Sequence, residues 1–399
     1  MHTNHMKKIV VVGAGTAGLL SLSYFCSFLD NTWEVVSIHD PNIDILGVGE
    51  STTPRVPFNL FHGMGFSFSQ DSELIDSTIK HYVRYVNWRK NDIISLIDTG
   101  TYGIHFNNLK LKDFAIKKLS EKWGTKFKEI KSKVISIENN KDNVLIQLED
   151  QKYSCDYLID CRGYPEDYSE YTISKNLPLN HCIVHTIQKP GDWDYTYHYA
   201  HKNGWMFGIP LTTRQGWGYL YNDRITSKED AIEDMSKILE INSQDLKVKD
   251  FEFKPYYANN ILNGRVLKNG NRFLFFEPIE ALSSFYYDEA NRFFGEYILG
   301  KITESEINST FRNYANMLEN FICFVYHGGS IYDSDFWKYA KKITSDKIKN
   351  DITFKNFVGY MNSFKKNPNL AGGVKPFSPW SWFNFDKSFG YNYFDRGYV

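Results

Sequence analysis

The spacing of apolar residues near the N-terminus changes from that of a strand to that of a helix and back again. Residues 7–12 form a short β-branched run, typical of a parallel strand buried on both faces. Glycines follow, then a stretch of helical character over 19–29 and a second strand over 33–39. The pattern predicts one strand–helix–strand unit.

The next part of the chain alternates between helical and extended periods. We expect an amphipathic helix over 113–123, a hairpin from segments 133–138 and 143–149, and a buried strand over 157–160. Acidic residues interleave the basic residues from 110 to 133, so we expect a solvated helix followed by a turn there.

Strand-like runs then dominate up to residue 260, and they suggest an antiparallel sheet inserted into an α/β core. The runs cover 181–188, 193–201, 204–211 and 217–221. From about residue 287 onward the periodicity is helical, and the tail is dense in aromatic residues.

Composition narrows the class of protein. Of the 399 residues, 42% are hydrophobic and 23% charged, which suits a globular core. A formal net charge of −1 gives no basic excess for nucleic acid, and the absence of a run of about 18 apolar residues argues against membrane insertion. The aromatic content of 17% reflects either a biased genome composition or a protein that stacks on flat molecules.

Cysteine usage and the N-terminus indicate the compartment. The five cysteines are scattered and form no CxxC pair, which favours a reducing cytoplasm over disulfides or a metal site. The N-terminal apolar stretch is too short for a signal peptide. We therefore expect a cytoplasmic protein without a structural or catalytic metal.

The segment after the first strand reads GAGTAG, and each of its glycines has a physical task. Gly13 permits a tight turn, Gly15 lets the backbone approach a pyrophosphate, and Gly18 lets the helix pack closely on the strand. Thr16 and Ala17 open the helix, whose N-terminus offers unpaired N–H groups to phosphates. The segment therefore predicts dinucleotide binding.

Two acidic residues extend this prediction. Asp40 ends the second strand 22 residues after Gly18, near the spacing of about 20 expected for an acid that binds a ribose hydroxyl. Asp160 begins the segment DCRG, which ends at Gly163 and is similar to the second flavin-contact segment of flavoprotein monooxygenases. This similarity favours FAD over NAD.

The predicted fold is α/β: an FAD-binding Rossmann-like core (GxGxxG) with an inserted antiparallel β-sheet and a helical C-terminal region. We expect a discontinuous FAD-binding domain over 1–185 plus 262–300. The inserted β-sheet substrate region would span 186–261, and a helical, aromatic-rich C-terminal region would span 301–399.

Six segments stand in the order that one enzyme family shows. They are GAGTAG at 13–18, GVGEST at 47–52, Lys80 with Trp88 eight residues later, CDYLIDCRGY at 155–164, GWMFGIPL at 204–211 with RQGWGYLY at 214–221, and EPIEAL at 277–282. Over most of residues 7–300 the sequence resembles the flavin-dependent halogenases of the tryptophan-halogenase type. The resemblance implies that reduced FAD, O2 and a halide ion give hypohalous acid, and that a separate flavin reductase supplies the reduced FAD.

The resemblance also implies site residues. Lys80 and Glu280 align with the family's active-site lysine and glutamate. Lys80 would present an electrophilic halogen to the substrate, either as a covalent haloamine or, as we favour, as a charged donor that polarises hypohalous acid. Glu280 would orient the oxidant and accept the proton that leaves the arene. Further flavin contacts are implied at Gly49, Glu50 and Ser51.

The family's tryptophan motif, WxWxIP, is partly present. Trp205, Ile209 and Pro210 match it, and Phe207 replaces the second tryptophan. In the family this motif walls off the flavin from the substrate. The alternative is that both aromatic residues are simply core of a strand.

The loop after EPIE departs from the family pattern, which usually continues Ser-Thr-Gly and holds the halide. Here Leu282 takes the threonine's place and Ser283 the glycine's, followed by Ser284. Backbone N–H groups and the serine hydroxyls remain as donors. Because chloride is the most strongly hydrated and hardest to oxidise of the usable halides, we expect bromide or iodide to be preferred.

We expect a small, electron-rich aromatic substrate of indole, phenol or pyrrole type. Tryptophan itself is not predicted, because no residue beyond 300 can be assigned to its carboxylate or amine. The oligomeric state is open, with a homodimer as one option. Two alternatives also stay open: a flavin monooxygenase that hydroxylates an aromatic substrate, and a non-catalytic FAD-binding protein.

Overall fold

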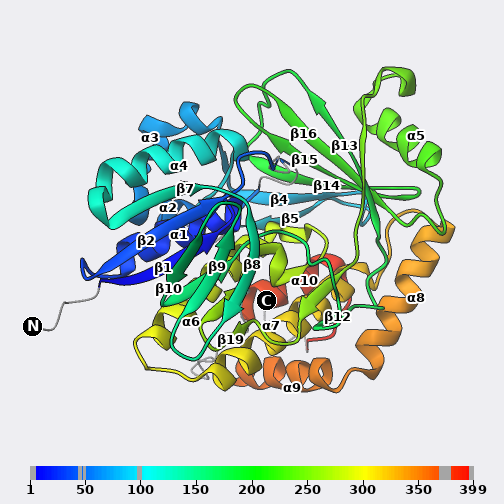
Figure 1. The fold of residues 1–399 in the computed structure, drawn as a ribbon. Helices are drawn as coiled ribbons and strands as arrows, with labels where there is room; N and C mark the ends of the chain where they lie inside the picture. The colour runs from blue at the N-terminus through cyan, green and yellow to red at the C-terminus, as the bar shows by residue number, and fades with distance from the viewer. Residues whose placement is uncertain (1–5, 44–46, 48–50, 97–100, 368–378, 395–399) are drawn as a thin grey trace, which may run out of the picture.

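The computed structural model describes residues 6–43, 47, 51–96, 101–367 and 379–394. Figure 1 shows three parts: a first sheet with its helices in blue and cyan, a second large sheet mainly in green, and C-terminal helices running from yellow to red. The predicted fold class is confirmed.

The first sheet holds six strands in the order β19-β20-β11-β1-β2-β7. Their bounds are β1 (Lys7–Val12), β2 (Trp33–His39), β7 (Phe127–Lys131), β11 (Tyr157–Asp160), β19 (Leu262–Asn263) and β20 (Val266–Lys268). All neighbouring pairs are parallel except β19 with β20. Helix α1 (Thr16–Phe28) joins β1 to β2, so the predicted strand–helix–strand unit is confirmed.

Strand β1 is buried on both faces, as its apolar run predicts. Ile9 and Val11 belong to the large core that includes α1, whereas Val10 and Val12 belong to a second cluster. That cluster packs against a three-stranded sheet, β8 (Val134–Asn139), β9 (Val144–Leu148) and β10 (Lys152–Cys155). The predicted hairpin is therefore confirmed as β8–β9.

The turn expected after the basic helix is present but short, spanning Gly124–Lys126, and a strand follows where the turn was expected to continue. Helix α4 (Asn108–Trp123) is present, but Phe127–Lys131 forms β7, which pairs with β2 at the edge of the first sheet. Lys126 is buried rather than solvated, and its Nζ donates a hydrogen bond to the Cys26 carbonyl at 2.8 Å. An edge strand needs only one apolar face, so alternating lysines are compatible with it.

The second large sheet holds seven strands in the order β17-β13-β16-β15-β14-β4-β5. Their bounds are β4 (Tyr82–Val86), β5 (Ile93–Leu96), β13 (His181–Ile187), β14 (Tyr195–His201), β15 (Gly204–Pro210), β16 (Gln215–Tyr221) and β17 (Lys249–Glu252). The expected antiparallel strands are present. The sheet is mixed, however, because β4 pairs with β14 in parallel. Since β4 and β5 precede the predicted insertion, the division of the chain at residue 186 stays a proposal.

Helices cover both large sheets. They are α2 (Arg55–Met64), α3 (Phe68–Asp71), α5 (Lys228–Leu239), α6 (Ser283–Ile298), α7 (Glu304–Tyr326), α8 (Asp335–Asn350), α9 (Ile352–Lys366) and α10 (Pro379–Phe389). Short strands complete the fold: β3 (Thr78–Lys80) with β6 (Gly103–His105), and β12 (Tyr171–Ile173) with β18 (Tyr256–Ala258) and β21 (Leu274–Phe275).

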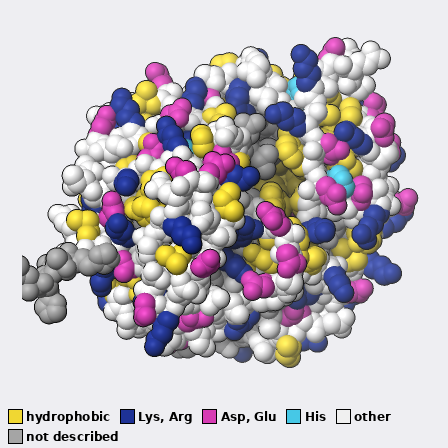
Figure 2. Space-filling model, in the orientation of Figure 1, with side chains coloured by type: hydrophobic (Ala, Val, Ile, Leu, Met, Phe, Trp, Pro, Cys, Tyr) yellow, Lys and Arg dark blue, Asp and Glu magenta, His cyan; other side chains and the backbone are white. Residues whose placement is uncertain are grey.

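The aromatic tail packs onto the body of the molecule. Trp382 lies against Phe324 with ring centroids 5.4 Å apart, and Phe389 lies against Tyr85 at 5.6 Å. In the space-filling view a hollow with hydrophobic side chains inside it lies between the regions of the two large sheets (Figure 2). None of the helices in the described ranges combines the length and apolarity that a membrane crossing requires.

Candidate active site

The glycine turn has the shape that a pyrophosphate cradle needs. Gly13 has φ +106°, and a Cβ there would lie 2.6 Å from the Cys161 carbonyl oxygen. A Cβ on Gly18 would lie 2.0 Å from the Gly13 oxygen, whereas Gly15 faces open space. Gly15 occupies the N-cap position of α1 without a side-chain cap, so the helix N-terminus remains available to an anion. The residues at this turn therefore fit the diphosphate of FAD.

Other predicted flavin contacts lie along the same edge of the sheet. Asp40 follows β2, and its Oδ1 accepts a hydrogen bond from the Asn42 N–H at 2.8 Å. Gly163 follows β11 with φ +87°. Ser51 is described and half-buried, whereas Gly49 and Glu50 lie outside the described residues.

Asp160 is engaged by two arginines. Arg162 binds it through Nε and Nη2, each at 2.9 Å, and Arg272 Nε lies 3.3 Å from its Oδ2. Burial would raise the pKa of Asp160, but these hydrogen bonds and charges outweigh it and hold the pKa below its ordinary value. The carboxylate thus anchors its own loop, and its contact with flavin stays a prediction.

Lys80 is the last residue of β3 and is 2% exposed. Its Nζ donates a hydrogen bond to the Thr52 carbonyl at 3.2 Å. Burial lowers its pKa to about 8, partly opposed by the negative charge of Glu280. A lysine in this state changes its charge close to neutral pH, which an exposed lysine does not.

Glu280 lies in a strained turn, where both it and Ala281 have positive φ, 61° and 56°. Its side chain is 8% exposed, and its Oε1 accepts a hydrogen bond from the Tyr85 hydroxyl at 2.7 Å. Burial raises the pKa of Glu280, while Lys80, Tyr85 and the Ser95 hydroxyl oppose the rise. The unusual backbone therefore serves to aim a carboxylate into the interior.

Lys80 and Glu280 are both buried, and the charge of each shifts the pKa of the other, so the two groups interact electrostatically although these two described residues form no direct ion pair. Their joint role in catalysis stays a prediction. Two histidines share their surroundings. Burial and then the charge of Lys80 hold the pKa values of His105 and His198 well below the ordinary value, so both rings are neutral. The site is thus a buried amine and carboxyl among neutral rings.

The residues of the partial tryptophan motif line one face of β15. Trp205, Phe207 and Ile209 point into the main core, and the intervening Met206 points to the opposite face beneath α5. Phe207 is accommodated by Gly218 on β16, where a Cβ would lie 2.3 Å from its ring. All these side chains, with Pro210, are buried, so their role as a flavin wall stays a prediction.

The predicted halide residues lie at the N-terminus of α6. The Ser284 hydroxyl donates to the Ala281 carbonyl at 3.2 Å and accepts from the Thr53 N–H at 3.3 Å. Ser283 forms a hydrogen bond with Tyr287 that lowers the tyrosine's pKa, although burial raises it overall. Leu282 is the N-cap residue and supplies no side-chain cap. The available donors for an anion are therefore mainly backbone N–H groups.

Glu277 is a buried acid whose importance the sequence analysis missed. It is 5% exposed, and within the described part of the chain neither carboxyl oxygen has a partner at hydrogen-bond distance. Burial raises its pKa to about 8, slightly opposed by the Tyr326 hydroxyl. The same hydroxyl accepts a hydrogen bond from Trp205 Nε1 at 2.6 Å. Burial therefore favours the protonated form of Glu277, which lies beside Tyr326.

Tyr85 was also missed, although it lies in the quoted segment between Lys80 and Trp88. The alternation of Val83 and Tyr85 along β4 is the signal that would have placed it inward. Trp88 is buried, and its Nε1 donates to the His198 carbonyl at 3.0 Å.

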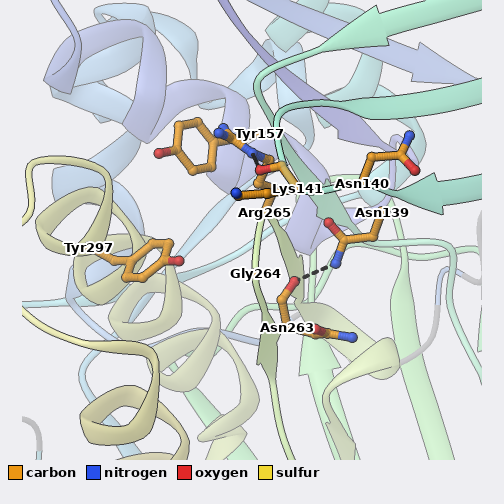
Figure 3. A pocket seen from close by; sticks show the side chains of 8 residues that line it. All are labelled: Asn139, Asn140, Lys141, Tyr157, Asn263, Gly264, Arg265 and Tyr297. Atoms are coloured by element: carbon orange, nitrogen blue, oxygen red, sulfur yellow. Dashed lines mark hydrogen bonds between the residues drawn. The ribbon is translucent and has the colours of Figure 1, made fainter.

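A surface pocket of about 410 Å³ lies apart from these residues, between the β8–β9 hairpin and the end of α6 (Figure 3). Its lining consists of Asn139, Asn140, Lys141, Tyr157, Asn263, Gly264, Arg265 and Tyr297. Its polar groups bond one another: Asn139 donates to the Asn263 carbonyl at 2.7 Å, and Arg265 to that of Lys141 at 2.9 Å. It contains none of the predicted site residues.

A dinucleotide-type turn on an α/β sheet, with a buried amine and carboxyl elsewhere in the molecule, places the chain in the class of dinucleotide-binding α/β proteins. A model of the tryptophan halogenase family matches residues 8–141 and 89–368, so the chain belongs to that family. It is therefore an enzyme, and it shares the family's use of FADH2, O2 and halide with a separate flavin reductase.

The chain is similar to individual relatives over most of its length. The tryptophan 6-halogenase ThaL of Streptomyces albogriseolus is 21% identical over 434 aligned positions, covering 88% of this chain and 82% of ThaL. A tryptophan halogenase from Shewanella frigidimarina superimposes with a TM-score of 0.80 at 16% identity, covering 96% of this chain and 89% of that one. BrvH, a flavin-dependent halogenase from Brevundimonas, gives 0.79 at 17% identity, covering 97% and 90%.

Proposed function

We propose that this protein is an FADH2-dependent halogenase that delivers hypohalous acid through Lys80 to a small, electron-rich aromatic substrate of indole, phenol or pyrrole type. The observation that carries the proposal is the buried, electrostatically coupled pair Lys80 and Glu280. When bound, reduced FAD would supply, with O2 and halide, the oxidant. The turn at Gly13, Gly15 and Gly18 would hold its diphosphate.

Lys80 acts as a charged hydrogen-bond donor in this proposal. At a pKa of about 8, roughly one lysine in ten is neutral at pH 7, against about one in 2,500 for an unperturbed lysine. A haloamine is thus less costly than the sequence suggested. The Thr52 carbonyl and the Glu280 carboxylate nevertheless both favour the ammonium form, which polarises hypohalous acid by donating to its oxygen.

Glu280 acts as the base. The arene carbon bonds to the halogen as the halogen–oxygen bond breaks, and the displaced hydroxide takes a proton from the Lys80 ammonium and leaves as water. Glu280 accepts the proton that the arene carbon loses and passes it back to Lys80, so the net products are the halogenated arene and water. The hydrogen bond from Tyr85 holds the carboxylate in one orientation for this transfer.

We also propose that bromide or iodide is used in preference to chloride. With the Ser284 hydroxyl already bonded to Ala281, the anion depends on backbone N–H groups and the dipole of α6. Chloride, which is the most strongly hydrated, loses most when donors are few.

The altered halide loop also favours a second candidate, an aromatic hydroxylase of the flavin monooxygenase class. The two candidates differ in the mass of the product. A halogenase adds the halogen that is present, whereas a hydroxylase adds oxygen whatever the halide.

The test is mass spectrometry of indoles, phenols and pyrroles incubated with FAD, a flavin reductase, O2 and mixed halides. We expect isotope doublets for the wild type and their loss in Lys80→Met at unchanged FAD binding. Lys126→Met is the matched control, because Lys126 is also a buried lysine but bonds carbonyls beneath α1. Full halogenation by Lys80→Met would refute the role of Lys80. Oxygenated products would favour the hydroxylase, and no product under any condition would indicate a non-catalytic FAD-binding protein.

A further inference from the structure

A line of hydrogen bonds runs past Lys80 through the buried ring of His105. Ser51 Oγ lies 2.9 Å from Thr196 Oγ1, which lies 2.9 Å from His105 Nε2. On the other side of the ring, His105 Nδ1 lies 3.0 Å from Thr78 Oγ1, which donates to the Pro210 carbonyl at 2.7 Å. Four side chains and one carbonyl thus form a single relay.

The donor and the acceptor of every hydrogen bond in the relay follow from the Pro210 carbonyl, where the relay ends. A carbonyl oxygen can only accept a hydrogen bond, so the Thr78 hydroxyl donates its single proton to Pro210. The Thr78 oxygen must therefore accept the hydrogen bond from His105 Nδ1. The ring is neutral, and its proton is therefore on Nδ1, which leaves Nε2 as an acceptor. Thr196 then donates to Nε2 and accepts from Ser51.

The relay joins three segments of the predicted site. Ser51 and Thr52 are the last two residues of the GVGEST segment, and Thr52 supplies the carbonyl that binds Lys80 Nζ. Thr78 lies two residues before Lys80 on β3. Pro210 ends β15, the strand of the partial tryptophan motif.

Backbone contacts hold the same region together. Ser51 forms an isolated β-bridge with His105, and the Thr52 hydroxyl bonds both the N–H and the carbonyl of Ile104. These contacts attach Ser51 and Thr52 to β6. They do not reach β14 or β15, which are joined to these residues through Thr196, His105 and Thr78.

We propose that His105 is a positioning residue. It holds Ser51, on the proposed flavin side, and β15, the strand of the partial tryptophan motif, at a fixed separation around Lys80. Oxidant formed on the flavin side then reaches Lys80 instead of solvent. This role rests on the proposed function. It deepens that function, because it assigns the containment of the oxidant to a residue that does not touch the substrate.

The isosteric variant Thr196→Val tests the relay, because it removes one hydroxyl and so breaks the side-chain link between Ser51 and His105 while their backbone bridge remains. Thr196→Ser is its matched control, since it keeps a hydroxyl. In single turnovers with prepared FADH2, halogenated product and free hypohalous acid caught by a scavenger are measured together. We expect the ratio of free oxidant to product to rise roughly fivefold in Thr196→Val, the factor expected when one neutral hydrogen bond is lost. Thr196→Ser should match the wild type.

A second test combines variants on the two sides of the His105 ring. If the relay acts as one unit, Thr78→Val combined with Thr196→Val changes the ratio no more than either change alone. Multiplied effects in the double variant, an unchanged ratio in Thr196→Val, or equal leakage in Thr196→Val and Thr196→Ser would each overturn the positioning role.

A spectroscopic readout does not depend on turnover. In protein labelled with 15N at histidine, the His105 signals should report a proton on Nδ1 and none on Nε2, and this pattern should persist on acidification to about pH 5. A proton on Nε2 would overturn the relay even in an active enzyme. A wild type that releases neither product nor hypohalous acid, yet shows the expected tautomer, would instead refute the proposed function, and the containment role with it.

Discussion

Burial gives Lys80 a property that its position in the sequence does not. Its pKa of about 8 lies close to neutral pH, so the two proposed forms of the lysine predict opposite pH profiles. If the ammonium polarises the oxidant, the rate of product formation falls as pH rises through about 8, because the donor loses its proton. If a neutral amine forms a haloamine, the rate rises over the same range.

We expect the falling profile. The measurement is single-turnover product formation with prepared FADH2 from about pH 6 to about pH 10, which separates chemistry from flavin reduction. Glu280→Gln is the control: because Glu280 opposes the fall in the pKa of Lys80, its removal should move the midpoint to lower pH. A rate that increases above pH 8 in the wild type would support the haloamine instead.

Glu277 predicts a pH dependence of stability. Its pKa rises from 4.5 in a model peptide to about 8 in the folded protein, so between these values the folded protein holds a proton that the unfolded chain has lost. The free energy of unfolding therefore falls as pH rises through this window. One pKa unit is worth about 1.4 kcal/mol, so the full effect is on the order of a few kcal/mol.

Glu277→Gln should remove this dependence. At about pH 4.5 the variant and the wild type should have similar free energies of unfolding, and at about pH 8 the variant should be more stable. Denaturant titrations across the window measure the difference. Glu233→Gln on the exposed face of α5 is the control and should follow the wild type. Parallel curves for Glu277→Gln and the wild type would mean that Glu277 is ionised in the folded protein.

The sequence predicted the residues that motifs carry and missed those whose chemistry depends on burial. Lys80 and Glu280 were found because they lie in family segments. Tyr85, His105 and Glu277 could be recognised only from the fold, which buries all three. In a water-poor interior hydrogen bonds are stronger and an unpaired polar group is costly. No spacing rule reports that environment.

Among the secondary-structure elements, predictions succeeded where the pattern of apolar and polar residues was clear. The boundaries of β11, β13 and β15 agree with the apolar pattern to within one residue, because both ends of each strand are marked by polar residues or glycine. The strands β4, β5 and β7 were not predicted. They lie at or near sheet edges, where one exposed face weakens the apolar signal.

The proposed preference for bromide or iodide over chloride can be tested at the N-terminus of α6. Leu282→Thr combined with Ser283→Gly restores the threonine and glycine of the family's usual loop, with Ala281 kept, and adds a hydroxyl donor at the helix N-terminus. We expect the ratio of chlorinated to brominated product at equal halide concentrations to rise by roughly tenfold, the effect of one charge-assisted hydrogen bond. Competition experiments read by mass spectrometry give this ratio directly. Leu282→Val should leave it unchanged, and chloride preference in the wild type would contradict the argument.

Arg89 joins the end of α10 and the segment after it to the body of the molecule. Arg89 donates from Nε to the Phe389 carbonyl at 2.9 Å, from Nη1 to that of Gly329 at 2.8 Å, and from Nη2 to the Tyr391 hydroxyl at 2.7 Å. A lysine keeps the charge but cannot reach three acceptors. Arg89→Lys should therefore increase the rate of limited proteolysis within the C-terminal segment.

An exposed arginine provides the control for this prediction. Arg312→Lys, where the guanidinium bonds the Asn259 carbonyl at 3.0 Å, should leave the proteolysis rate near that of the wild type. Equal rates for Arg89→Lys and the wild type would show that aromatic packing alone holds the segment.

The whole molecule assembles its site from distant parts of the chain. Lys80 and Tyr85 come from β3 and β4, His198 from β14, and Glu280 from the turn before α6. The first strand–helix–strand unit was predictable because its contacts are local. The parallel pairing of β4 with β14 and the docking of α10 join residues more than a hundred positions apart, and no local pattern encodes such pairings.

The net charge of the molecule affects how reduced FAD reaches its binding site. The sequence has one dinucleotide unit and a formal net charge of −1, so neither a nicotinamide site nor a strong long-range field for steering an anionic flavin is expected. Chemically reduced FAD mixed with aerated buffer should therefore support product formation without any reductase. The initial rate should depend on the concentration of free FADH2 and change less than about twofold between low and physiological ionic strength, where charge-steered encounters slow markedly. An absolute requirement for one particular reductase, or a steep loss of rate with salt, would instead indicate transfer within a protein complex held by complementary charge.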